Sequence, residues 1–225
     1  MTLPQSKASS TYIVKYMNYM GRAALVRSLL HLSGAQYKNV FVTSEEIALN
    51  RAEYPFGLVP ILIETRPDGT TFELAEAMAI EQYLAEKLGF LGSTPEEAAV
   101  NKSVALNVYL EHYPYCFDSS PEKRRTFEEN VLPRFLESHT RWLVKNGNNG
   151  HYFGEMVSYA DLAMAHWIRL IDVLGYNINL DGWTKEQIQE GQEQHPLRKL
   201  EKVISELPEW QGQYDNFHPT SSIVP

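Results

Sequence analysis

The chain has 225 residues, a net charge of −8, and a content of 44% apolar and 21% charged residues that is typical of globular proteins. This length is enough for one large domain or two small ones, each with its own core. The acidic charge, without any basic cluster, argues against binding to the phosphate backbone of nucleic acids. No apolar run approaches the roughly 18 residues of a membrane span, and residues 1–15 lack the apolar stretch of a signal peptide.

A single cysteine, Cys116, excludes an internal disulfide and a Cys-x-x-Cys pair. A reducing compartment fits this composition. Because signals for export and membrane insertion are also missing, we expect a cytoplasmic protein without a membrane partner.

The N-terminal part of the chain alternates strand and helix signals. The predicted elements are, in order, strand 12–17, helix 23–32, strand 40–42, an irregular stretch 43–57, strands 61–63 and 71–74, and helix 76–88. Pro67-Asp68-Gly69 indicates a hairpin between the last two strands. The order β-α-β followed by β-β-α predicts a thioredoxin-like domain over residues 11–89. Residues 1–10 are small and polar, typical of a flexible extension.

Strand signals almost disappear after residues 89–93, which look like a linker. Thr94-Pro95-Glu96-Glu97 has the residues of a capped helix start. The predicted helices are 95–113, 121–145, 159–174 and 196–206. Pro133 is expected to kink or split the second of them. Residues 94–225 are therefore predicted to form an all-helical domain.

Four local motifs occur in order along the chain. They are Tyr12-Ile13-Val14-Lys15-Tyr16-Met17 with Gly21-Arg22 and Arg27, then Val59-Pro60-Ile61, then residues 74–80 (LAEAMAI), then residues 154–161 (GEMVSYAD). Their combination and spacing resemble the tyrosine-type glutathione S-transferases over about residues 11–210. The sigma class is the most similar, partly because Tyr113-Pro114-Tyr115 looks like its aromatic-Pro-aromatic element; the pi class is also similar.

The resemblance implies a thioredoxin-like domain followed by an all-α domain, glutathione as co-substrate, no metal, and a homodimer. The implied reaction adds the glutathione thiolate to a small hydrophobic electrophile. Related thiolate chemistry, such as isomerisation or peroxide reduction, would use the same site.

Tyr16 is the candidate catalytic residue, at the end of the first predicted strand. A free thiol has a pKa of roughly 8.5, so a thiolate at neutral pH needs stabilisation. A neutral phenol can donate a hydrogen bond to the anion and keep its proton. From the strand alone, Tyr16 would be a core aromatic residue; Gly21-Arg22 behind it favours catalysis.

The resemblance also assigns Arg22 to the thiolate, near a helix start that favours an anion. A solvated charge or an ion pair is an equally good interpretation of Arg22. Arg27, in the body of the helix, is expected to be structural.

Four further residues are the candidate glutathione-binding set. Pro60 is expected to be cis, so that the backbone of Val59 pairs with the cysteinyl part of glutathione as an added strand. Glu76 and Ala77 open a helix whose free N–H groups would hold the γ-glutamyl carboxylate, while Glu76 faces the ammonium group. Without the family, Pro60 is an ordinary edge proline and Glu76 a favourable first-turn charge.

The chain departs from the family pattern at three places. Ala77 replaces a serine, Leu58 replaces a polar residue, and Asn107-Val108 replaces acidic residues that reach glutathione across the dimer. These differences put tight glutathione binding in doubt. A ligand-binding or structural protein of the same fold is therefore the alternative function, whereas a thiol-redox enzyme is excluded because no cysteine lies near the first helix.

The electrophile pocket is expected between the domains, near Tyr16. Met20, Leu110 and Tyr115 are its candidates by position in the family, although for any one of them ordinary packing is favoured over a contact with the substrate. Ser158-x-x-Asp161, flanked by Val157 and Leu162, predicts a capping box with a hydrophobic staple and is assigned to folding. His166 is expected to be a hydrogen-bonded core residue, and the histidines show no metal-ligand spacing.

Overall fold

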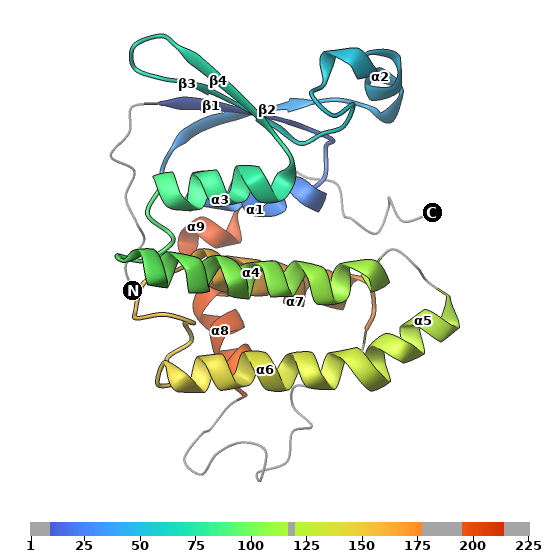
Figure 1. The fold of residues 1–225 in the computed structure, drawn as a ribbon, viewed down its shortest axis with the longest axis vertical. Helices are drawn as coiled ribbons and strands as arrows, with labels where there is room; N and C mark the ends of the chain where they lie inside the picture. The colour runs from blue at the N-terminus through green and yellow to red at the C-terminus, as the bar shows by residue number, and fades with distance from the viewer. Residues whose placement is uncertain (1–9, 117–119, 177–194, 214–225) are drawn as a thin grey trace. The chain divides into compact units, whose positions relative to one another are not determined.

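The computed structural model of the protein describes residues 10–116, 120–176 and 195–213 (Figure 1). These residues divide into two units: residues 10–90 with 208–213, and the described residues between 91 and 207. The first unit mixes strands and helices and the second is helical, which confirms the predicted fold class. None of the helices in the described part of the chain is long and apolar enough to cross a membrane.

The first unit is built on a mixed sheet with strand order β2-β1-β3-β4. The strands are β1 Thr11–Tyr16, β2 Gln36–Phe41, β3 Ile61–Thr65 and β4 Thr71–Ala75. β1 runs parallel to β2 and antiparallel to β3, and β3 and β4 form the predicted hairpin. Parallel neighbours need a crossover connection, which the helix α1 (Ala24–Leu32) supplies.

One face of the sheet is covered by α1 and α3 (Ala77–Lys87), which lie side by side (Figure 1). Successive side chains of a strand point to opposite faces, and Tyr12, Val14 and Tyr16 of β1 are all buried. Tyr16 is the last residue of the strand, so its hydroxyl lies where the sheet ends and the chain turns towards α1.

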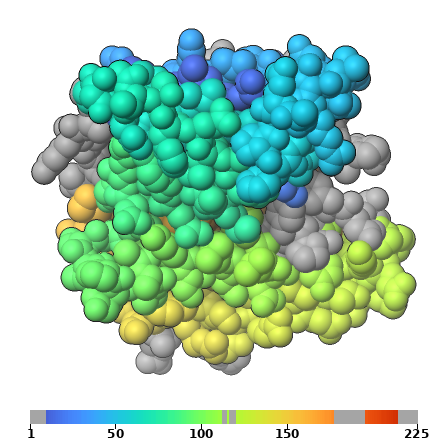
Figure 2. Space-filling view, turned by 45° about the horizontal axis from the view of Figure 1, so that its top comes forward, coloured from blue at the N-terminus to red at the C-terminus, as the bar shows by residue number. Residues whose placement is uncertain are grey.

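The prediction that residues 43–57 are irregular is wrong, because α2 spans Ser44–Leu49 and a 3-10 turn spans Arg51–Glu53. A capping box begins α2: the Thr43 hydroxyl accepts the N–H of Glu46 at 3.2 Å, and the Glu46 carboxylate accepts the N–H of Thr43 at 2.6 Å. The helix buries none of its residues, so it lacks the apolar periodicity that reveals a helix in a sequence. Figure 2 shows this segment, in light blue, at the surface.

The helical unit is arranged around α7. Its helices are α4 Pro95–Cys116, α5 Pro121–Thr126, α6 Leu132–Lys145, α7 Tyr159–Val173 and α8 Pro196–Ser205. α7 packs against α4 and α8, and most of its side chains are buried. A π-helical turn over Phe127–Val131 divides α5 from α6 just before Pro133, which is the split that the sequence predicts.

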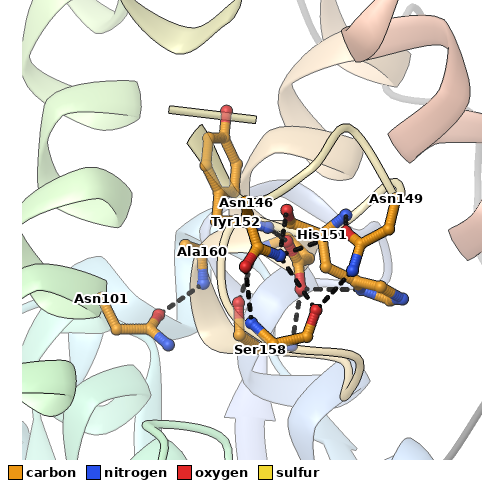
Figure 3. A network of polar contacts seen from close by, with 9 residues as sticks. Asn101, Asn146, Asn149, His151, Tyr152, Ser158 and Ala160 are labelled. Atoms are coloured by element: carbon orange, nitrogen blue, oxygen red, sulfur yellow. Dashed lines mark hydrogen bonds and ion pairs between the residues drawn. The ribbon is translucent and has the colours of Figure 1, made fainter. Parts of the chain in front are cut away.

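The start of α7 is held by a network of side chains (Figure 3). Ser158 and Asp161 form the predicted capping box. The Asp161 carboxylate also accepts the N–H of Tyr152 at 2.7 Å, and the Asn101 amide oxygen of α4 accepts the N–H of Ala160 at 2.8 Å. Two first-turn N–H groups of this buried helix, those of Ala160 and Asp161, thereby find acceptors in α4 and in the N-cap residue Ser158.

A short helix, α9 (Pro208–Gln211), was not predicted. It contacts α1, and the hydroxyl of Ser28 on α1 donates to the amide oxygen of Gln213. Trp210 of this segment is buried. Residues 208–213 thus belong with the first unit, whereas the sequence assigned them to the helical domain.

Candidate functional site

Tyr16 is a buried tyrosine with a polar environment around its hydroxyl. Its side chain is only 3% exposed, and its hydroxyl accepts the backbone N–H of Arg22 at 3.1 Å. This bond uses a lone pair of the phenol oxygen and leaves the O–H proton to be donated in another bond. The ring of Tyr19 packs edge-on against the ring of Tyr16 with centroids 5.4 Å apart.

Gly21 lets the backbone approach this hydroxyl. Its φ is +40°, in the region that L side chains rarely adopt. A Cβ atom at this position would lie 2.7 Å from the Tyr16 hydroxyl oxygen and 2.5 Å from the Tyr19 ring. Real Cβ atoms do not approach other heavy atoms this closely. The hydrogen bond between Tyr16 and Arg22 in this geometry therefore requires glycine at position 21.

Arg22 contributes its backbone to the site in this structure. Its N–H is the donor to Tyr16, and its side chain is exposed at the second position of the 3-10 turn Gly21–Ala23. The role of its guanidinium with a thiolate stays a prediction.

Arg27 was expected to be structural, but the sequence did not indicate that it contacts the Tyr16 site. It is 1% exposed on α1, and its guanidinium donates to the carbonyl oxygens of Tyr19 at 2.6 Å and Met17 at 3.3 Å. It also donates to the side-chain oxygen of Asn39 on β2 at 2.8 Å. The guanidinium carbon lies 5.6 Å from the centroid of the Tyr16 ring. The available signal was a charged residue inside the apolar face of a predicted helix.

Burial lowers the pKa of Arg27 to about 10, and the nearby phenols of Tyr37 and Tyr16 act in the opposite direction. At neutral pH the side chain therefore remains a cation. A buried positive charge thus lies beside the candidate catalytic phenol.

The peptide bond between Val59 and Pro60 is cis, as the resemblance predicts. Val59 is half-buried and packs against a small apolar cluster formed by Tyr54, Ile61 and Ala75. The side chain before it, Leu58, is 53% exposed, so an apolar surface stands where the resemblance predicts a polar side chain. The contact of the Val59 backbone with glutathione stays a prediction.

Glu76 stands out by its backbone. It is the N-cap of α3 with φ 74° and ψ 116°, and no side chain caps the helix there. A residue other than glycine in this region is strained by about 1–3 kcal/mol, and such residues gather at functional sites. Glu76 is exposed and Ala77 is buried, so this helix start has an acidic side chain at its surface and no hydroxyl beside it.

The three candidates for the electrophile pocket lie in different units. Met20 is buried in the first unit. Leu110 of the helical unit is 65% exposed, and Tyr115 is half-buried with its ring centroid 5.4 Å from that of Phe127. Their joint role stays a prediction.

Three other residues named from the sequence also have defined surroundings. His166 is half-buried on α7, and burial together with Arg169 lowers its pKa to about 3, so it is neutral at physiological pH. Asn107 of α4 bonds to the ring of His139 at 3.1 Å, and Val108 is buried. Within residues 10–116, 120–176 and 195–213, no three His, Cys, Asp or Glu side chains gather at a point that could hold a metal ion.

Comparison with known proteins agrees with this geometry. Residues 108–209 match the family model described as the glutathione S-transferase C-terminal domain. The chain is 27% identical to glutathione S-transferase 3 of Caenorhabditis elegans and 30% identical to S-crystallin 2 of Octopus vulgaris, in each case over 68% of this chain and 77% of the relative. Among solved structures, the sigma-class transferase of Fasciola hepatica superimposes with a TM-score of 0.73 at 23% identity, covering 92% of this chain and 94% of that chain.

The chain has the fold of thioredoxin-like proteins with a helical second domain. The features that define this class here are the two units, the cis Val59–Pro60 bond and the capped central helix α7. The chain belongs to the glutathione S-transferase family. The family named from its motifs is confirmed.

Proposed function

We propose that this protein is a glutathione S-transferase in which the Tyr16 hydroxyl stabilises the glutathione thiolate. One observation carries the proposal: a buried phenol accepts a backbone N–H at 3.1 Å, beside a glycine that no other residue can replace without a clash. Such a phenol is oriented by its partner, and its proton is directed away from that N–H.

The energetics of this arrangement suit thiol activation. A hydrogen bond to a charged group contributes roughly 1.5–3 kcal/mol. At about 1.4 kcal/mol per pKa unit, this lowers the pKa of the bound thiol by roughly one to two units, from about 8.5 towards neutrality. The reaction then needs no separate general base.

The chemical step is thiolate attack on an electrophilic carbon. A carbon–sulfur bond forms, and a leaving group departs with the electron pair of its bond. In conjugate addition the electron pair moves to the neighbouring carbon instead, which then takes up a proton. Tyr16 keeps its own proton throughout, because it donates a hydrogen bond and transfers no charge.

Glutathione would lie along the edge formed by the cis Val59–Pro60 segment and the start of α3. The backbone of Val59 would pair with the cysteinyl part, and the N–H groups of Ala77 and its neighbours would hold the γ-glutamyl carboxylate. Glu76 would face the ammonium group. The strained backbone of Glu76 supports a functional role for this turn.

The remaining parts of the proposal rest on the family. The electrophile would contact Met20, Leu110 and Tyr115, and Arg22 would add positive charge near the thiolate. We place the protein in the cytoplasm as a homodimer with a detoxifying role, in which isomerisation or peroxide reduction by the same thiolate would be side reactions.

A second candidate function is a non-catalytic ligand-binding or structural protein. Leu58 and Ala77 favour it, because each removes a polar group from the proposed glutathione site. The likeness to an octopus protein named as a crystallin, and not as a transferase, adds support.

The test that separates the two functions has two parts. The protein is passed over immobilised glutathione, and conjugation of glutathione to chlorodinitrobenzene is then measured at neutral pH. A transferase is retained and produces the conjugate. A protein that is neither retained nor active overturns the proposal, whereas retention without turnover supports the binding function.

A further inference from the structure

The loop between β1 and the 3-10 turn is held from inside by one buried cation. Arg27 donates to the carbonyl oxygens of Met17, Tyr19 and, at 3.5 Å, Met20. This loop leads directly into Gly21 and Arg22, whose backbone meets the Tyr16 hydroxyl. The same side chain therefore contacts the loop that orients the phenol and faces the phenol ring itself.

The charge of Arg27 is favourably placed for an electrostatic effect on Tyr16. It lies 5.6 Å from the ring centroid in a site that excludes water, where an opposite charge favours the ionised form of a neighbouring group. A phenol whose anion is stabilised is also a stronger hydrogen-bond donor. Such a donor stabilises a bound thiolate more strongly.

β1 and the elements packed against it carry further charged or titratable groups. They are Tyr19 in the loop, Arg22 on the 3-10 turn, Arg27 and His31 on α1, Tyr37 and Lys38 on β2, Glu64 on β3, Glu81 and Lys87 on α3, and Tyr12 and Lys15 on β1 itself. Two of these charged side chains, Glu64 and Lys15, have partners other than Tyr16. Glu64 bonds to Ser10, Tyr83 and Lys87 opposite the start of β1, and the Lys15 ammonium lies over the ring of Tyr54.

We propose that Arg27 is a positioning residue for the reaction, which holds the Met17–Met20 loop on Tyr16 and makes its phenol a stronger donor to the thiolate. This inference rests on the proposed function, since it assigns a partner to the same hydroxyl. It differs from a structural role because the positive charge matters, and not only the hydrogen bonds.

Asn39→Asp separates charge from structure. The side-chain oxygen of Asn39 accepts from Arg27 Nε at 2.8 Å, so an aspartate keeps the shape and the bond while it neutralises the cation. We expect unchanged or higher thermal stability, because the hydrogen bond gains a charge. The pKa of the Tyr16 phenol should rise by about one unit, and kcat/KM at about pH 6.5 should fall about two- to ten-fold.

The phenol is followed by NMR of protein with ¹³Cζ-labelled tyrosine, and the Tyr16 signal is assigned by its loss in Tyr16→Phe. Asn50→Asp is the matched control, because it adds the same charge to an exposed position of the same unit. It should leave both the phenol pKa and kcat/KM unchanged. A phenol that titrates identically in Asn39→Asp and in the wild type overturns the inference.

Two further variants complete the experiment. Arg27→Gln should raise the phenol pKa like Asn39→Asp, and Asn39→Asp decides the question alone if Arg27→Gln does not fold. In the Tyr16→Phe background, Asn39→Asp should lose most of its effect on kcat/KM, because the charge acts through the hydroxyl. If Tyr16→Phe itself retains full activity, the proposed function fails, while the phenol titration still decides whether Arg27 tunes Tyr16.

Discussion

The Tyr16 hydroxyl and the backbone of Gly21 lie so close together that no Cβ atom fits at position 21. We expect Gly21→Ala to displace the Arg22 N–H from the phenol, because its Cβ would lie 2.7 Å from the hydroxyl oxygen. Conjugation should fall by about ten-fold or more, from the loss of one oriented hydrogen bond. The measurement is kcat/KM with chlorodinitrobenzene at neutral pH.

Gly69→Ala is the control for this prediction. Gly69 also has a positive φ, 81°, but no atom lies within 4 Å of the Cβ that the substitution adds. It should destabilise the hairpin by about 1 kcal/mol and leave kcat/KM unchanged. If the two variants were equally active, the close approach at Gly21 would have no part in catalysis.

Ala77 is the position where one atom decides between the two candidate functions. Ala77→Ser restores a hydroxyl at the start of α3, which would donate to the γ-glutamyl carboxylate. We expect a gain of about three- to thirty-fold in glutathione affinity, since desolvation of the hydroxyl offsets part of the new bond. Calorimetric titration of both forms measures it, with the exposed Ala79→Ser as control.

The Ala77→Ser titration can give three results, and each has a different interpretation. A small gain with unchanged turnover indicates a working site that has compensated. A weak wild type that the serine rescues indicates drift towards a binding role. No change, with weak binding in both forms, would mean that Ala77 does not face the carboxylate and that this placement of the site is wrong.

Individual residues differ in how well the sequence predicts them. Tyr16 and the cis Val59–Pro60 bond were predicted because they lie in short motifs with fixed neighbours. Arg27 was expected to be structural because it lies in the body of a helix. Its contacts with three carbonyl oxygens and Asn39 could not be predicted, since no pattern along the chain connects these groups.

At the scale of elements, α7 shows that a helix can be capped by a distant helix as well as by its own residues. Asn101→Ala removes the oxygen that accepts the N–H of Ala160 and leaves a buried donor without that partner. We expect a loss of about 1–3 kcal/mol in the free energy of unfolding. Urea denaturation measures it, and Ser103→Ala on the exposed face of α4 is the control.

An Asn101→Ala variant as stable as Ser103→Ala would mean that the bond between α4 and α7 contributes nothing. The comparison is made between two substitutions in one helix, so a general effect of alanine on α4 cancels.

The predicted elements succeed or fail for identifiable reasons. Helices with a long apolar face or a capping box before buried residues, such as α1 and α7, were found. α2 and α9 were missed, since the first buries no residue and the second has only four residues. The assignment of residues 208–213 to the first unit also escaped prediction, because it depends on contacts with α1 that are distant in sequence.

At the scale of the whole molecule, we expect a homodimer. Phe56 and Leu58 of the first unit are 63% and 53% exposed, which is unusual for large apolar side chains close together in the sequence. An isologous two-fold contact is the commonest way to cover such surfaces.

Light scattering at micromolar concentration should give twice the 25.8 kDa mass of the chain. Phe56→Ser should shift the equilibrium towards the monomer, because it removes exposed apolar surface without affecting a buried contact. A wild-type protein of monomer mass would contradict the expectation.

The claim that Tyr16 activates the thiolate is tested most directly by the pH profile of kcat/KM for Tyr16→Phe. The matched control is Tyr12→Phe, which removes another buried hydroxyl from the same face of β1. Tyr16→Phe should lower conjugation by about ten- to a hundred-fold at about pH 6.5, and the loss should shrink as the pH passes the free thiol's pKa of about 8.5, while Tyr12→Phe keeps the wild-type profile. Full activity of Tyr16→Phe at about pH 6.5 would contradict the account, because the thiolate would then form without the hydroxyl.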